Sequence, residues 1–380
     1  MIFSSPLYLV DARRSPIGRF GGGLKALAPA DLALPVAEAV VPAGLKTHVD
    51  QVILGQVLQA GAGMNVARQV GLRLGLPQHA PAFTVNMACA SGLKAVALAA
   101  SAIAGGEAAL VLAGGVESMS RAPHYATDLR WGRKLGDASL LDGIFADGLS
   151  DPVLKLGMGE TAERIADLHS ITREEQDRFA VRSQQLVDHA AFRREIVPVG
   201  GVEADEHPRG DTTLEKLAQL KPSFRGSGTV TAGNASGIND GAALVLVASE
   251  AAVKQHALSP RARIVAATAV GCDPATMGLG PVGAIRRLCE EAAWTLDGVD
   301  AVEINEAFAA QALGCVRELK LDLAKLNRRG GAIALGHPIG ASGARVLTTL
   351  LHLLEDTNGK RGIASLCVGG GMGIALAIER

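Results

Sequence analysis

The chain has 380 residues, of which 46 are glycine and only 3% are aromatic. A hydrophobic fraction of 48% and a net charge of −1 exclude a disordered chain, and the glycines lack the triplet period of collagen. The 37 basic and 38 acidic residues create no broad field for nucleic acid or an anionic membrane, so we expect neither as a partner. The composition instead predicts an aliphatic core in which glycine serves turns and close backbone contacts.

Five cysteines stand far apart in the chain, at Cys89, Cys272, Cys289, Cys315 and Cys367. Their odd number and the lack of a Cys-x-x-Cys pair argue against a disulfide framework and a zinc site, and favour a reducing compartment. The first residues contain no apolar stretch typical of a signal peptide, so we expect a cytoplasmic protein. An uncharged run over 362–378 approaches membrane-spanning length, but four glycines interrupt it, which predicts two strands joined by a glycine turn.

The first regular pattern lies in residues 83–112. Residues 83–85 are β-prone, residues 91–104 form a small-residue helical stretch that ends at a glycine pair, and residues 109–112 form an apolar strand. The order strand, helix, strand is typical of an α/β protein with buried sheets.

Residues 121–237 differ from the rest of the chain because they are rich in charge and in loop-forming residues. One helix is predicted here, since Thr172 and Glu175 form a capping box ahead of an apolar pattern. We interpret this segment as an inserted lid over an active site. The alternative is a surface elaboration with no role in function.

A second regular pattern follows near the C-terminus. Strands are predicted over 302–304, 332–335 and 363–367, with a helix over 341–354. This block repeats letters of the first, because Ala-Ser-Gly opens the helix in both, at residues 90 and 341. The two blocks therefore predict a duplicated domain with mixed sheets covered by helices.

Cys89 lies directly after a predicted strand and before a predicted helix. The N–H groups at a helix N-terminus lower a thiol pKa, so Cys89 is a candidate nucleophile. The alternative is a cysteine that packs as a small hydrophobic residue.

Three further positions follow predicted strands and are candidates for chemistry. His337 occupies a turn in the second repeat, and it would share a site with Cys89 if the two repeats face each other. Cys367 precedes a glycine-rich run whose N–H groups could bind a reacting oxygen. Asn305 could orient water or a carbonyl group. The alternatives are a hydrogen-bonded turn for His337 and a helix cap for Asn305.

Taken together, these blocks resemble the thiolase family, and the resemblance spans essentially the whole chain. The motifs that carry it are Arg13 to Gly18, Asn86-x-x-Cys89-x-Ser91-Gly92, Gly233 to Ala242, Met277 to Pro281, Asn305-Glu306-Ala307-Phe308, Gly336-His337-Pro338-x-Gly340-x-Ser342-Gly343 and Cys367-x-Gly369-Gly370-Gly371-x-Gly373.

The resemblance implies an α/β fold with two duplicated mixed-sheet domains in a five-layer α-β-α-β-α arrangement. The N-terminal domain would comprise residues 1–120 with 238–258, and the C-terminal domain residues 259–380. Residues 121–237 would form a loop domain over the coenzyme A site.

The resemblance also implies ping-pong acyl transfer, in which two easier steps replace one hard carbon–carbon bond change. Cys89 would carry the acyl group as a thioester, His337 would accept its proton, and Cys367 would move the proton at the acyl α-carbon. One oxyanion hole would consist of His337 with a water held by Asn305, and the other of the N–H groups of Cys89 and Gly369.

Coenzyme A thioesters would be the substrates, and neither a separate cofactor nor a metal is expected. Four positions match family contacts to coenzyme A: Ser236 near the pantetheine, Arg209 near the nucleotide, and Met158 and Met277 along the acyl and pantetheine channel. We also expect a homo-oligomer, either a dimer or a tetramer.

Gly157 departs from the family pattern, because many members that act on acetoacetyl-CoA carry a histidine there. The stretch from Gln59 to Asn65 resembles the biosynthetic branch, so acetyl-CoA C-acetyltransferase activity is the first expectation and a broader 3-ketoacyl-CoA thiolase the second. A decarboxylating condensing enzyme would carry histidine in place of Cys367. A non-catalytic relative is the remaining alternative, although all four catalytic positions are present.

Overall fold

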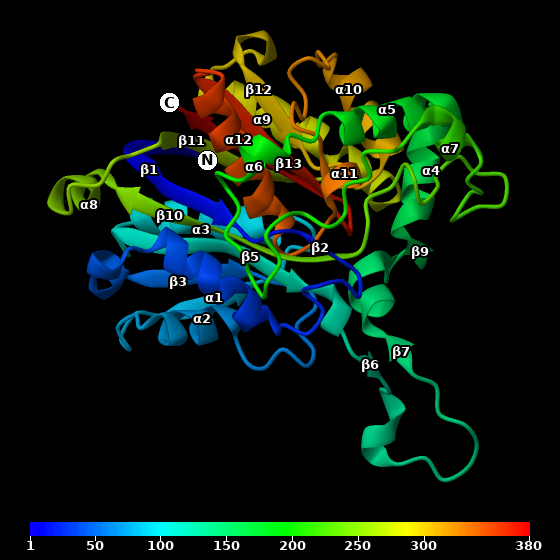
Figure 1. Cartoon of the computed structure of the whole chain (residues 1–380), viewed down its shortest axis with the longest axis horizontal. Coiled ribbons are helices and arrows are strands. Elements are labelled where there is room, and N and C mark those ends of the chain that lie inside the picture. The colour runs from blue at the N-terminus through cyan, green and yellow to red at the C-terminus, as the bar shows by residue number, and fades with distance from the viewer.

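The computed structural model describes residues 1–380, apart from the side chain of Ser4. Strands and helices alternate in two halves, which lie one above the other in Figure 1. The first half contains β1 (Ile2–Arg14), α1 (Pro29–Val40), β3 (Gln51–Gly55), α2 (Val66–Leu74), β4 (Ala82–Val85), α3 (Ser91–Ala104), β5 (Leu110–Ser118), β10 (Asn239–Ser249) and α8 (Glu250–Gln255). The second contains β11 (Ala262–Gly271), α9 (Gly280–Ala292), β12 (Ala301–Ile304), α10 (Ala309–Leu319), α11 (Ala332–Leu335), α12 (Ser342–Asp356), β13 (Arg361–Val368) and β14 (Met372–Glu379).

The strands form one long path in the order β12-β13-β14-β11-β1-β10-β5-β3-β4. Pairing is parallel for β3 with β4 and β5 and for β12 with β13, and antiparallel for the other neighbours in this path. The predicted mixed sheets are therefore present, and β1 joins them. Because β1 is long and irregular, it pairs with β11 through Leu9 and with β10 as far as Arg14.

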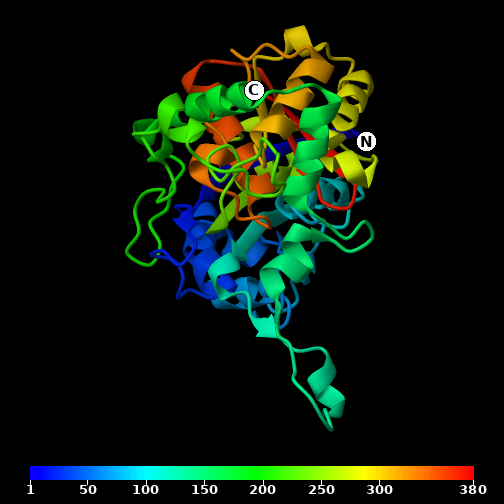
Figure 2. The same ribbon diagram turned by 90° about the vertical axis from the view of Figure 1, so that its right-hand side faces the viewer.

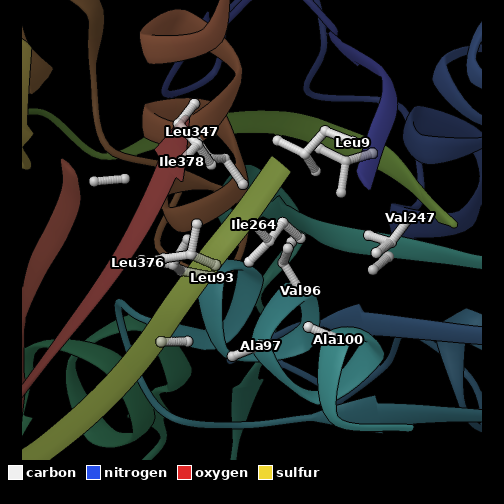
Figure 3. Packing of buried hydrophobic residues seen from close by; sticks show 14 of the residues in the cluster. Leu9, Leu93, Val96, Ala97, Ala100, Val247, Ile264, Leu347, Leu376 and Ile378 are labelled. Atoms are coloured by element: carbon white, nitrogen blue, oxygen red, sulfur yellow. The ribbon is translucent and has the colours of Figure 1, made fainter. Parts of the chain in front are cut away.

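Helices separate and cover the two halves of the sheet. Helices α3 and α12 contact each other and lie between the halves, α1 and α2 cover the outer face of the first half, and α9 covers that of the second. Figure 3 shows the middle layer, where Leu93 and Val96 of α3 and Leu347 of α12 pack with Ile264 and Leu376 of the strands. The five-layer arrangement predicted from the sequence is confirmed.

The predicted strand over residues 332–335 is wrong, because these residues form the helical turn α11. The carboxylate of Glu306 accepts the N–H of Ile333 at 3.3 Å and holds the turn in place. The position beside β12 is taken by Leu326, in an isolated parallel bridge to Val302. Four apolar residues cannot distinguish a buried helical turn from a buried strand.

Residues between β5 and β10 form short strands, helices and loops. The strands are β6 (His124–Tyr125), β7 (Leu141–Asp142), β8 (Ser150–Asp151) and β9 (Leu156–Gly157), and the helices are α4 (Met158–Leu168), α5 (Arg173–Gln185), α6 (His189–Phe192) and α7 (Leu214–Ala218). The short strand β2 (Gly18–Arg19) lies outside this segment, between β1 and α1, and pairs with β10. Single turns are η1 (Ala43–His48), η2 (Met119–Arg121), η3 (Asp128–Trp131), η4 (Phe145–Leu149), η5 (Pro274–Leu279) and η6 (Leu296–Gly298). The capping box of Thr172 and Glu175 at α5 is confirmed.

An extended arm and the uncharged run near the C-terminus complete the description of the fold. An arm between β6 and β7 extends away from the body of the molecule, as Figures 1 and 2 show. The uncharged run over 362–378 forms β13, a glycine turn and β14, as predicted. Among the described residues, we find no helix whose length and apolar character would let it cross a membrane.

Candidate active site

A cavity of about 420 Å³ lies where the two halves meet the segment between β5 and β10. Seven predicted site residues line it: Cys89, Met158, Arg209, Ser236, Met277, His337 and Cys367. The other two, Asn305 and Gly369, lie beside it and contact lining residues. Residues from distant parts of the chain thus come together in one site.

Cys89 follows a tight turn that links β4 to α3. Ala88 has φ = 43°, a left-handed conformation that is uncommon for alanine. The side chain of Asn86 accepts the N–H of Ala88 at 2.9 Å, and the hydroxyl of Ser91 donates to the carbonyl of Ala88 at 2.7 Å. The Asn86-x-x-Cys89-x-Ser91 spacing therefore fixes the backbone that presents the thiol.

The thiol of Cys89 is half-buried at the cavity wall. Burial raises its pKa to about 11, although the N–H of Gly369 and its own N–H oppose this rise, and the nearby charge of Glu117 adds to it. The predicted lowering of this pKa is wrong, because loss of solvent outweighs the helix N-terminus. The same two N–H groups are those that the sequence assigns to an oxyanion hole.

His337 is buried between α11 and α12 with both ring nitrogens engaged. Ser342 Oγ donates to the carbonyl of Pro338 at 2.9 Å and lies 2.6 Å from His337 Nδ1, so Nδ1 carries the hydrogen. His337 Nε2 then accepts from Asn305 Nδ2 at 3.4 Å. Burial, together with the charge of Arg345, lowers the pKa of His337 to about 3, so the imidazole is neutral.

The loop that holds His337 has little freedom. Its N–H donates to Asn239 Oδ1 at 2.9 Å. The preceding Gly336 has φ = 101°, and a Cβ there would lie 2.4 Å from the Asn239 side chain, so only glycine fits. The Gly336-His337-Pro338 motif is thereby explained by geometry.

Asn305 follows β12 and is fully buried beside His337. It caps no helix, because α10 begins at Ala309 with Phe308 at its N-cap, so the alternative reading of Asn305 is wrong. Its Oδ1 atom has no hydrogen-bond partner among the described residues. The amide therefore retains an acceptor for a small polar ligand at the site.

Cys367 is buried near the end of β13 and lines the same cavity as Cys89 and His337. Burial raises the pKa of this thiol well above its ordinary value, and the nearby thiol of Cys89 contributes to the rise. Two uncharged thiols therefore share the site, one on each duplicated half.

The predicted coenzyme A contacts line the same cavity but differ in their burial. Met277 is buried and Met158 packs against the same cluster as Cys367. Arg209 is exposed, and its backbone N–H donates to Gln184 Oε1 at 2.8 Å. The cavity thus runs from an apolar interior to a mouth with a free basic side chain.

Sequence reasoning missed several residues of the wall. Phe224 and Phe308 line the cavity with their ring centroids 5.9 Å apart and edge to face. His207 also lines it, and burial lowers the pKa of this imidazole to about 4. Phe308 belongs to the Asn305–Phe308 motif, which is the one signal that could have identified it. Within the described part of the chain, no group of three or more His, Cys, Asp or Glu could hold a metal ion.

Comparison with known proteins gives matches along the chain. The family described as "Thiolase, N-terminal domain" matches residues 7–251, and "Thiolase, C-terminal domain" matches residues 258–380. Acetyl-CoA acetyltransferase of Allochromatium vinosum is 49% identical, covering 98% of this chain and 99% of that protein. Bacillus anthracis acetyl-CoA acetyltransferase superposes with a TM-score of 0.96 at 45% identity, covering 99% and 98% of the two chains. Human mitochondrial 3-ketoacyl-CoA thiolase in complex with CoA superposes equally well at 44% identity, covering 100% and 99%.

Proposed function

Because the chain belongs to the thiolase family, we propose that it is an acetyl-CoA C-acetyltransferase. It would join two acetyl-CoA molecules into acetoacetyl-CoA and CoA, and would catalyse the reverse thiolysis. The observation that carries this proposal is that Cys89, Cys367 and a neutral His337 line one cavity. The names of close full-length relatives support the choice of acyl group.

In the first step, the sulfur of Cys89 attacks the carbonyl carbon of acetyl-CoA while its proton passes to His337 Nε2. The carbonyl oxygen becomes an oxyanion and accepts the N–H groups of Cys89 and Gly369. The bond to the CoA sulfur then breaks, and the departing CoA sulfur takes the proton of the Cys367 thiol. Cys367 is left deprotonated, and His337 keeps the proton from Cys89 on Nε2. This role of His337 is supported by the Nδ1–H contact to Ser342, because it leaves the acceptor lone pair on Nε2, the nitrogen that faces the Asn305 amide.

In the second step, another acetyl-CoA loses an α-proton to the deprotonated sulfur of Cys367. The enolate oxygen accepts hydrogen bonds from His337 and from a water bound by Asn305. The α-carbon then forms a bond to the acetyl carbon on Cys89, and the Cys89 sulfur leaves as a thiolate that takes its proton back from His337 Nε2. Cys367 keeps the α-proton, so every group returns to its starting state. The unpartnered Oδ1 atom of Asn305 supports the bound water.

For the substrate, we propose that Met158, Met277 and Ser236 contact the pantetheine and that Arg209 contacts the nucleotide. The open cavity mouth at Arg209 supports this orientation. A second candidate is a 3-ketoacyl-CoA thiolase with a broader chain-length range. It is favoured by Gly157, which lines the cavity and where a Cβ would meet only Glu160 Oε2 at 3.4 Å. Thiolysis rates across C4 to C16 3-ketoacyl-CoA separate the two, and we expect the highest rate at C4.

We also propose that the chain forms a homotetramer and acts in the cytoplasm. Assembly is supported by the arm over residues 126–140, which exposes 90% of Trp131 and 92% of Leu135. Large apolar side chains that are exposed together mark a site of interaction with another protein. The five free cysteines support a reducing compartment.

The test of the function compares two cysteine variants with a matched control. Cys89→Ser should form no acyl-enzyme with acetyl-CoA, whereas Cys367→Ala should still be acetylated at Cys89 and yet lose turnover by about 10³-fold or more. Cys289→Ala lies in the outer helix α9 and serves as the control. Protein mass after incubation with acetyl-CoA and the rate of acetoacetyl-CoA thiolysis are the measurements. Normal acetylation of Cys89→Ser, or full turnover by Cys367→Ala, would contradict the assigned roles.

A further inference from the structure

Glu117 is a fully buried carboxylate near the end of β5, a strand whose preceding residues are apolar or glycine. It does not line the cavity. Its Oε2 atom accepts the N–H of Val57 at 3.0 Å and that of Gly340 at 2.9 Å, and its Oε1 atom accepts the N–H of Leu58 at 3.1 Å. One side chain thus binds backbone from two other segments.

Both segments belong to the surroundings of the reacting groups. Val57 and Leu58 follow β3, and they pack in one cluster with Ile339 and the nucleophile candidate Cys89. Gly340 lies three residues after His337 in the loop before α12. Glu117 therefore connects the wall around Cys89 with the loop that carries His337.

The approach of this loop to Glu117 is close. A Cβ on Gly340 would lie 2.6 Å from the Val116 carbonyl oxygen and 2.7 Å from Glu117 Oε2. Such distances cannot be met by a side chain without moving the loop. The position of His337 is thus coupled to the distance between Gly340 and Glu117.

We propose that Glu117 is a positioning residue for acyl transfer, which fixes the loop at residues 336–340 so that His337 Nε2 is aligned with the thiol of Cys89. The inference rests on the proposed function. Three N–H donors need acceptors on both oxygens, and an ionised carboxylate supplies them whereas a carboxamide has a single oxygen. Because Glu117 does not line the cavity, its effect on the alignment of His337 passes through the two segments whose N–H groups it accepts.

The main test is Glu117→Gln, which keeps the shape but points an NH₂ group at one of the three donors. Burial raises the pKa of Glu117 to about 7 against the three N–H groups, so kinetics are measured at pH 8, where the wild-type carboxylate is ionised. We expect kcat for acetoacetyl-CoA thiolysis to fall about 10- to 100-fold, as small misalignments do, while KM stays within about threefold. The single-turnover rate of Cys89 acetylation should fall in parallel.

Asp50→Asn is the matched control, because Asp50 accepts the N–H groups of Ala109 and Leu110 at 2.7 and 3.0 Å at the opposite end of β5. It should lower the thermal midpoint and leave kcat within about twofold, since surface caps act on stability alone. Gly340→Ala is the second variant, and it should lower kcat as Glu117→Gln does. The double variant should lose less than the product of the two effects, because both act through one contact.

Unchanged kcat in Glu117→Gln, or a fall in kcat matched by Asp50→Asn at equal loss of stability, would overturn the inference while the proposed function stands. Multiplicative losses in the double variant would also overturn it. A wild-type protein that fails to acetylate Cys89 would overturn both proposals together.

Discussion

At the scale of single residues, the resting site holds neutral groups. Burial is the leading cause of both main shifts, and it raises the pKa of Cys89 to about 11 and lowers that of His337 to about 3. A thiol and an unprotonated imidazole are therefore present at neutral pH, in place of a thiolate–imidazolium pair. For the proposed function, this means that the thiolate of Cys89 forms only during the reaction.

These pKa directions predict how Cys89 reacts with an uncharged alkylating reagent such as iodoacetamide. The thiolate fraction rises about tenfold per pH unit below the thiol pKa, so the rate should rise continuously from pH 7 to pH 10. The measurement is the mass-spectrometric rate of alkylation of the Cys89 peptide, with Cys89→Ser as the background. A plateau below pH 8 would contradict the neutral pair and indicate a preformed ion pair.

The sequence was a better guide to which residues gather at the site than to their protonation states. Cys89, His337 and Cys367 could be placed together because each lies in a glycine-containing motif of a duplicated block. The pKa direction of Cys89 could not be predicted, because its burial depends on a cluster that includes Val57 and Ile339, whose members meet only in the fold. The contacts of Glu117 could not be predicted for the same reason, since the N–H groups of Val57, Leu58 and Gly340 that donate to it are remote in sequence.

At the scale of elements, α5 links the segment over the cavity to the second half. Its Ser183 hydroxyl donates to the buried Glu306 carboxylate at 2.6 Å, and its Gln184 accepts the N–H of Arg209. The helix could be predicted because its capping box is local in sequence. The turn α11 could not, because the Glu306 contact that makes it helical comes from outside the four residues.

Removing the cap of α5 should therefore lower stability without stopping the chemistry. In Thr172→Ala, Glu175 loses the hydroxyl that accepts its N–H at 3.2 Å. We expect a loss of about 1 kcal/mol in the free energy of unfolding. Urea unfolding and thiolysis kinetics measure the change, and kcat should stay within about twofold of wild type because no group in the cavity is altered. An unchanged unfolding midpoint would contradict the role of the cap.

At the scale of the whole molecule, the duplication places one thiol on each half and the imidazole at their junction. The two strand–helix–strand blocks and the loop-rich segment between them could be predicted from sequence patterns, apart from the strand over 332–335, and the five layers from the family resemblance. The position of β1 between β10 and β11 could not be predicted, because the sequence of this thirteen-residue strand does not indicate that it pairs with a strand of each half. The arm shown in Figure 2 was also not predicted as a separate projection.

The arm provides the prediction for this scale. The double variant Trp131→Ser with Leu135→Ser should shift the protein to a smaller assembly, because it removes the most exposed apolar side chains of the arm. Val153→Ser, which removes a side chain that is 81% exposed outside the arm, is the control and should leave assembly unchanged. Sedimentation velocity reports the mass of each. A monomeric wild-type protein, or an unchanged assembly of the double variant, would contradict the proposed tetramer contact.

The pairing of β5 with β10 has a consequence for folding during synthesis on the ribosome. The two strands are adjacent in the sheet, yet all of residues 119–238 must be synthesised between them. During synthesis, β5 cannot pair with β10 until β10 has emerged from the ribosome. Strand β13, which contains Cys367, emerges later still. Long-range pairing of this kind folds slowly and leaves apolar strand edges open in the meantime. The nascent chain therefore exposes the edge of β5 until β10 has been made, and it lacks the proposed acid–base thiol of Cys367 until nearly its last residue has been added.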